Sequence, residues 1–182
     1  MVRTRVGYAG GTIPDPNYQR MGDHSETIQV DYNPGKVSYQ RLLDIFWESH
    51  SPTSKVWSQQ YMNFIFTHNR EQEQLAHNTW IEVQEKATGK VSTEIMLYKG
   101  FYLAEDHHQK HFLQGYYDLA DVFKEIYPDF DEFLNSTTIA RVNGYIGGYG
   151  SLSSVKKEID MLEISSEKKK KLKKLVSSKD RR

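Results

Sequence analysis

An alternation of strands and helices over the first hundred residues most constrains how this 182-residue chain folds. Residues 2–9 and 25–32 alternate polar side chains with apolar or β-branched ones, which predicts two half-buried strands. Residues 38–50 carry apolar side chains at helical spacing behind Ser38, a good N-cap, and this predicts an amphipathic helix. Strands and helices that succeed one another in this way indicate an α/β (α+β) domain.

The following residues continue the alternation. Residues 62–68 and 91–97 are predicted strands, residues 70–87 a polar helix between them, and residues 104–114 a further helix. The succession resembles a ferredoxin-like α/β plait of the βαββαβ kind, with a mixed sheet, whose first strand and first helix are missing. The first strand of such a plait is central. We therefore expect its absence to leave two neighbouring strands without a partner and to expose their apolar faces.

Three segments are predicted along the chain: a domain over residues 1–115, a helical and Gly-rich segment over 116–150, and a helical, Lys-rich tail over 151–182. The last two form a helical C-terminal extension. The glycines from Gly144 to Gly150 lack the strand–turn–helix context of a dinucleotide site, and we expect a mobile segment that wraps over the substrate site. The lysine run from Lys168 to Lys174 is either a solvated helix or an interaction patch for anionic partners, and the acidic residues before it favour the solvated helix.

Composition excludes several classes of function. The 24 basic and 24 acidic residues balance, so no global charge favours nucleic acid or a membrane surface as a partner. The chain contains no cysteine, which excludes a disulfide, a thiolate metal site and a thiol nucleophile within it. The first residues lack the apolar stretch of a signal peptide, and no apolar run is long enough to cross a bilayer. We therefore expect a cytoplasmic monomer.

Separated motifs carry a family resemblance over roughly residues 3–114. They are Gly7-Tyr8-Ala9-Gly10-Gly11, Asp15-Pro16-Asn17-Tyr18, Gly22-Asp23-His24-Ser25-Glu26, Gln60-Tyr61 and the segment from Phe101 to Gln109. In this order and spacing they resemble the peptide methionine-(S)-S-oxide reductase family, the A-type methionine sulfoxide reductases. The resemblance implies reduction of methionine-S-sulfoxide in oxidised proteins, a repair of oxidative damage. It also implies that no cofactor is bound and that thioredoxin or another thiol is the reductant.

The same resemblance implies roles for three residues. Glu26 lies where the family places the acid that protonates the sulfoxide oxygen, and Tyr18 and Tyr61 match the two phenols that bind this oxygen. The chemistry explains these residue types, because the oxygen is a poor leaving group unless it is protonated. Partial burial would raise the pKa of a glutamate towards the physiological range. Phenol hydroxyls can donate hydrogen bonds to the oxygen as negative charge develops.

The chain departs from the family pattern at its reactive centre. Relatives attack the sulfoxide sulfur with a cysteine in a Gly-Cys-Phe-Trp-Gly segment, which lies upstream of the stretch where this chain begins, and no cysteine is present here. Residues 55–58 also replace an Asp that many relatives carry. We therefore expect the chain as written to be inactive, and two hypotheses stay open. It is a reductase family member in a truncated isoform or record, or it is a non-catalytic pseudoenzyme that binds oxidised methionine or a partner.

The histidines are predicted to be structural. His107 and His111 share one face of the predicted helix, but no third ligand is specified, so no metal site is predicted. His24 lies two residues before Glu26 and is expected to act as a hydrogen-bonding partner rather than as a base.

Overall fold

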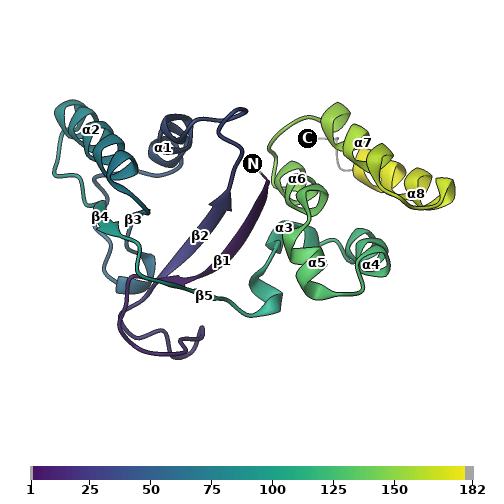
Figure 1. Ribbon diagram of the computed structural model, residues 1–182, viewed down its shortest axis with the longest axis horizontal. Helices are drawn as coiled ribbons and strands as arrows, with labels where there is room; N and C mark the ends of the chain where they lie inside the picture. Colours follow the sequence, from purple (N-terminus) through teal and green to yellow (C-terminus); the bar gives the residue numbers. More distant parts are fainter. Residues whose placement is uncertain (1, 179–182) are drawn as a thin grey trace. The chain divides into compact units, whose positions relative to one another are not determined.

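The computed structural model describes residues 2–178, which divide into two compact units. The sheet unit consists of Val6–Ile28 and Tyr32–Ala104, and the helical unit consists of the chain up to Arg5, the segment Gln29–Asp31 and the chain from Glu105 onward. Helices and strands are both present, which confirms the predicted α/β class (Figure 1). The boundary predicted at residue 115 falls inside the helical unit.

Two small sheets contain the strands. Strand β1 (Arg3–Ala9) lies in the middle of a three-stranded sheet, with β2 (Ser25–Asp31) on one side and β5 (Phe101–Leu103) on the other. Strands β1 and β5 are antiparallel, with Gly7 opposite Leu103. A side chain at Gly7 would collide with the carbonyl oxygen of Tyr102, so this close pairing requires glycine.

The second sheet is a parallel pair, β3 (Phe64–Thr67) and β4 (Glu94–Leu97), connected by helix α2 (Arg70–Lys86). Helix α1 (Tyr39–Glu48) begins as predicted, because the side chain of Ser38 accepts a hydrogen bond from the Arg41 backbone N–H at 3.1 Å. The buried apolar side chains of these elements form one cluster: Leu43, Ile65 and Ala76.

A single mixed sheet was predicted, but among the described residues β3 pairs only with β4 and no ladder joins it to β2. The apolar side chains of β2 are covered unequally, because Val30 is partly buried. Ile28, predicted to be half-buried, is 61% exposed. The expectation that apolar strand residues would be exposed therefore holds at Ile28.

The helical unit contains short helices packed around a single core (Figure 1). They are the 3₁₀ turn η2 (Asp106–His108), α3 (His111–Gln114), α4 (Tyr117–Ile126), α5 (Phe130–Asn135), α6 (Thr137–Ile146), α7 (Leu152–Met161) and α8 (Ser166–Ser177). The largest side chains of the core are Phe123 and Phe133, at most 2% exposed.

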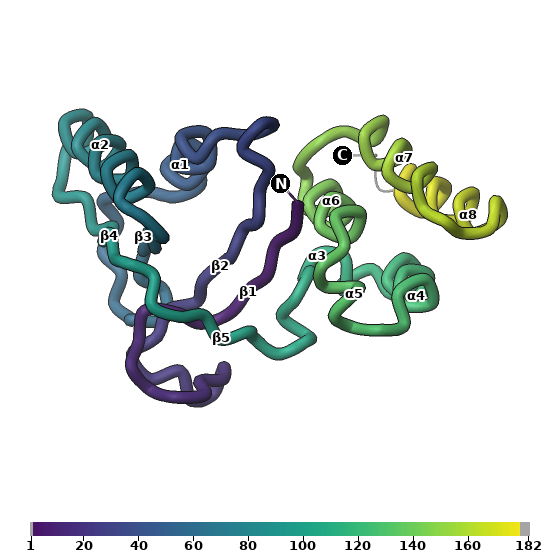
Figure 2. The backbone as a smooth tube through the Cα atoms, in the orientation of Figure 1, coloured from purple at the N-terminus to yellow at the C-terminus, as the bar shows by residue number. Residues whose placement is uncertain are grey.

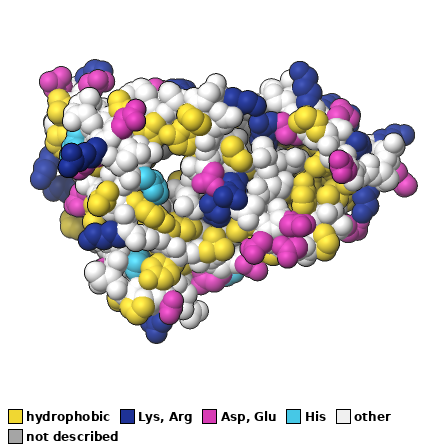
Figure 3. All heavy atoms as spheres, viewed as in Figure 1, with side chains coloured by type: hydrophobic (Ala, Val, Ile, Leu, Met, Phe, Trp, Pro, Cys, Tyr) yellow, Lys and Arg dark blue, Asp and Glu magenta, His cyan; other side chains and the backbone are white. Residues whose placement is uncertain are grey.

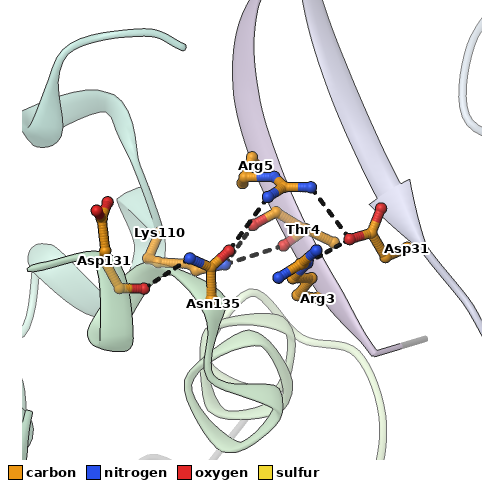
Figure 4. Close-up of polar contacts among 7 residues, drawn as sticks. All are labelled: Arg3, Thr4, Arg5, Asp31, Lys110, Asp131 and Asn135. Atoms are coloured by element: carbon orange, nitrogen blue, oxygen red, sulfur yellow. Dashed lines mark hydrogen bonds and ion pairs between the residues drawn. The ribbon is translucent and has the colours of Figure 1, made fainter.

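The predicted helix over residues 104–114 is wrong, because Lys110 interrupts it. Lys110 adopts a left-handed conformation with φ of +48°, which separates η2 from α3. Its buried side chain donates hydrogen bonds from Nζ to the carbonyl oxygen and, at 3.3 Å, to Oγ1 of Thr4 (Figure 4). Burial, and then the nearby charge of Arg5, lower the pKa of Lys110 to about 8.

Two arginines of β1 form further polar contacts in the helical unit, near the contact between Lys110 and Thr4. Arg3 and Arg5 both pair with Asp31, and Arg5 also donates to the side-chain oxygen of Asn135 at 3.2 Å (Figure 4). These contacts attach the first residues of β1 to the segment that carries α5.

The C-terminal extension is more ordered than predicted. Residues 143–146, predicted as part of a mobile wrap, are the last turn of α6, and Ile146 is buried in the core of the helical unit. The lysine run forms α8, whose residues Leu172 and Val176 are completely buried. Lys168 pairs with Glu125 at 3.3 Å and Lys173 pairs with Asp160. Residues 179–182 of the predicted tail lie outside the described residues.

Charge is evenly distributed on the visible surface. On the face shown in Figure 3, basic and acidic side chains are interspersed. Within residues 2–178 there is no helix whose length and apolar character would let it cross a membrane.

Candidate functional site

The β1–β2 loop and the start of β2 carry the first two site residues. Strand β1 ends at Ala9, the chain runs out through a long loop, and β2 begins at Ser25, so Tyr18 lies on the loop and Glu26 on the strand (Figure 2). Around Tyr18 the loop folds on itself. The backbone N–H of Arg20 donates to both the carbonyl and the side-chain oxygen of Asn17, at 3.0 and 2.8 Å. This tight turn fixes the backbone on both sides of Tyr18.

The third site residue arrives on η1, a 3₁₀ turn over Gln59–Tyr61 that docks onto the start of β2. The Ser25 hydroxyl donates to the carbonyl oxygen of Gln59, and the Gln60 side-chain amide donates to the Glu26 carboxylate at 2.7 Å. The two hydrogen bonds join segments 34 residues apart in sequence. Tyr61 therefore lies next to Glu26.

Tyr18 and Tyr61 interact directly. Their side chains share a hydrogen bond, and the pKa of Tyr61 is raised, first by the neighbouring Tyr18 phenol, then by desolvation and by the Glu26 carboxylate. The structure thus brings together all three residues that the sequence singled out. A raised pKa means that Tyr61 keeps its proton to a higher pH than an ordinary tyrosine, and so remains a hydrogen-bond donor.

The cluster is open to solvent. Tyr18 is 48% and Tyr61 57% exposed, and Glu26 is exposed as well. The partial burial that was expected for Glu26 is therefore not observed in the described residues. Trp57, on the segment that replaces the Asp of many relatives, is 93% exposed and contributes no cover.

The arrangement of Tyr18, Tyr61 and Glu26 could bind one small hydrogen-bond acceptor. Two phenol O–H groups and one carboxyl group converge, and in the absence of a ligand the phenols bond to each other. An oxygen carrying partial negative charge could take both phenol hydrogen bonds at once, as the oxygen of a sulfoxide requires.

Sequence reasoning missed two contributors to this geometry. Gln60 was noted only as part of a motif, yet it holds the Glu26 carboxylate. Asp23 accepts hydrogen bonds from the Thr12 backbone N–H at 2.8 Å, from the Thr12 hydroxyl at 2.8 Å and from the Ile13 N–H at 3.3 Å. The signal for each was its place in a motif, Gln60 with Tyr61 and Asp23 with Glu26. His24 is a buried hydrogen-bonding residue, as expected.

The remaining histidines do not form a second centre. The rings of His107 and His108 lie 4.1 Å apart in the helical unit, and His111 packs against Phe112. Over residues 2–178, no group of three or more His, Asp or Glu side chains is arranged to hold a metal ion.

Comparison with known proteins identifies the family. The model of the peptide methionine sulfoxide reductase family matches residues 1–138, about three quarters of the chain. This chain belongs to the peptide methionine sulfoxide reductase family. A second family model, the helical domain of selenoprotein methionine sulfoxide reductase A, matches residues 129–177. The C-terminal helices are therefore similar to a known domain of this family, which the resemblance over residues 3–114 did not reach.

Several relatives support the assignment. The chain is 38% identical to a peptide methionine sulfoxide reductase of Drosophila melanogaster, over 91% of this chain and 67% of the relative. It is 36% identical to peptide methionine sulfoxide reductase A5 of Arabidopsis thaliana, over 80% of this chain and 59% of that protein. The chain thus spans about three fifths to two thirds of the relatives' lengths.

Solved structures agree with the sequence relatives. The fold is similar to methionine sulfoxide reductase A of Corynebacterium diphtheriae, with a TM-score of 0.53 and 27% identity over 62% of this chain and 63% of that one. It is also similar to the reduced form of Mxr1 from Saccharomyces cerevisiae, with a TM-score of 0.53 and 31% identity over 58% of this chain and 66% of that one.

Proposed function

We propose that this chain recognises methionine-S-sulfoxide in oxidised peptides and proteins, with Tyr18 and Tyr61 as donors to the sulfoxide oxygen and Glu26 as the acid beside it. The observation that carries the proposal is the convergence of these three side chains, from three separate segments, in a member of this family. Repair of oxidised protein is the biological setting that the family membership supports.

We further propose that the 182-residue polypeptide does not reduce the sulfoxide by itself. Reduction of a sulfoxide to a thioether removes the oxygen as water and requires two electrons, which two thiols can supply by forming a disulfide. The reaction starts when a thiolate attacks the sulfoxide sulfur and becomes a sulfenic acid. A Ser or Tyr hydroxyl contains no sulfur and cannot form this intermediate. The chain contains no cysteine. Acting alone, it is a binding protein.

Ligand binding tests the first part. The open site offers about three hydrogen bonds of roughly 1 kcal/mol each, which predicts a Kd in the millimolar range. NMR titration with N-acetyl-L-methionine-(S)-sulfoxide should shift resonances of Tyr18 and Tyr61, and N-acetyl-L-methionine should not. The double variant Tyr61→Phe, Glu26→Gln should lose binding, whereas Tyr149→Phe, at an exposed tyrosine of the helical unit, should keep it. Equal binding by the double variant would exclude the site.

Turnover tests the second part. The purified chain, incubated with dithiothreitol and the same sulfoxide, is expected to produce no more methionine derivative than a sample without protein. Product above that background would show that the polypeptide needs no cysteine and would overturn the proposal.

A further inference from the structure

His24 is held in a single protonation state by the residues around it. The ring is 2% exposed; its Nδ1 accepts a hydrogen bond from the Gly11 backbone N–H at 3.1 Å, and its Nε2 lies 2.8 Å from the carbonyl oxygen of Ile13. A backbone N–H can only donate and a carbonyl can only accept, so Nδ1 carries no proton and Nε2 carries one. The ring is therefore neutral, and Tyr102 of β5 packs against it edge-on at 5.4 Å.

Asp23 holds the same stretch of backbone. Its carboxylate accepts from Thr12 and Ile13, and these hydrogen bonds, the Thr12 backbone N–H first, lower the pKa of Asp23 to about 2. The side chains of Asp23 and His24 thus form hydrogen bonds with the backbone of residues 11–13. A Cβ at Gly11 would lie 2.6 Å from the His24 ring and 2.5 Å from the Asp23 carboxylate, so only glycine lets both approach.

These contacts join the two arms of the loop that carries Tyr18. Residues 11–13 belong to the arm that leaves β1, and residues 23 and 24 belong to the arm that enters β2 (Figure 2). Glu26 follows His24 by two residues. The hydrogen bonds of His24 and Asp23 therefore fix the base of the Tyr18 loop relative to the strand that presents Glu26.

We propose that neutral His24 is a positioning residue for sulfoxide recognition, and that its protonation releases the loop and weakens binding. This inference rests on the proposed function of the same site. A proton on Nδ1 would make this nitrogen a donor. It would then face the Gly11 N–H, which is also a donor, and the buried hydrogen bond between them would be lost. The Asp23 carboxylate next to it stays charged throughout the range in which histidines titrate, and Tyr102 is the neutral group packed on the ring.

Binding affinity as a function of pH is the first measurement. Between pH 8 and pH 5 the affinity for N-acetyl-L-methionine-(S)-sulfoxide should fall about five- to tenfold, the effect of losing about one hydrogen bond. His24→Asn retains an acceptor near the position of Nδ1 but cannot be protonated, so its affinity should be independent of pH over this range. His24→Phe should bind weakly at every pH. His107→Asn, at an exposed histidine, should follow the wild-type curve. Wild type and His24→Asn both keep Glu26, so the difference between their pH curves reports on His24.

A second measurement does not require ligand. ¹⁵N NMR of the imidazole nitrogens should show the Nε2–H form at pH 8, and resonances of Tyr18 should shift with the same midpoint as His24 in the wild type and not in His24→Asn. If the tautomer and the coupled shift are observed but no sulfoxide binds, the proposed function fails and the positioning role of His24 stands. If Tyr18 does not respond when His24 is protonated, the positioning role is refuted, whether or not the sulfoxide binds.

Discussion

Replacing Lys110 with methionine should change how the stability of the protein depends on pH. Lys110 is buried in the helical unit, bonded through Nζ to Thr4, and its pKa is lowered from 10.5 to about 8. Because the pKa of Lys110 is lower in the folded state, the unfolded chain binds more protons than the folded chain at pH values between about 8 and 10.5. The free energy of unfolding therefore rises with pH from about 8 to about 10.5. Integrated between pH 7 and pH 10, the two pKa values give a gain of about 2–3 kcal/mol from this residue.

Urea unfolding at pH 7, 8, 9 and 10 would measure this gain. Lys110→Met keeps the length of the side chain and its Cβ in the left-handed backbone, but has no group that titrates. The difference in unfolding free energy between wild type and Lys110→Met should therefore shift by about 2–3 kcal/mol in favour of wild type across the series. Lys170→Met, at an exposed lysine of α8, is the matched control and should run parallel to wild type. Parallel curves for wild type and Lys110→Met would refute the assignment of a buried, charged lysine.

Three further substitutions and one exposed control test the packing, all by urea unfolding at pH 7. Phe123→Ala, at a fully buried ring, should lower the unfolding free energy by about 3–5 kcal/mol, whereas Tyr117→Ala, 78% exposed, should change it by less than about 1 kcal/mol. Leu172→Ala should lower it by about 2–5 kcal/mol if α8 belongs to the core, and a loss below about 1 kcal/mol would make the helix an appendage. Tyr39→Phe should raise it by about 1 kcal/mol, because the buried Tyr39 hydroxyl has no hydrogen-bond partner among residues 2–178, and a loss of stability would contradict this.

Local signals predicted the elements whose ends are set by local contacts. The helix predicted for residues 38–50 occurs as Tyr39–Glu48, because its start depends on the hydrogen bond between Ser38 and Arg41. The helix predicted for residues 104–114 failed because its break is set by a long-range contact. Lys110 bonds to Thr4, 106 residues away, and no propensity marks a lysine for a left-handed conformation.

The burial of side chains was less predictable from the sequence than the positions of the helices and strands. The lysines of α8 suggested a solvated helix, but Leu172 and Val176 are buried by helices that the sequence could not place beside them. The alternation in β2 suggested one buried face, and Ile28 is exposed because no other element covers it. Periodicity shows which residues share a face, but tertiary packing decides whether that face is covered.

The candidate site shows the same division. Tyr18, Glu26 and Tyr61 were found from the family resemblance of the motifs that contain them. The hydrogen bonds that bring their segments together join residues 34 apart in sequence, so no local signal could have predicted this meeting. Their exposure could not be found in this way. It matters for the chemistry, because burial is what would favour the protonated form of a carboxyl. In the described chain the three groups can bind an oxygen. Under the proposed function, a bound peptide could exclude water from Glu26. A sulfoxide-containing peptide that covers Glu26 should therefore bind more tightly than a free amino-acid sulfoxide that leaves it in water.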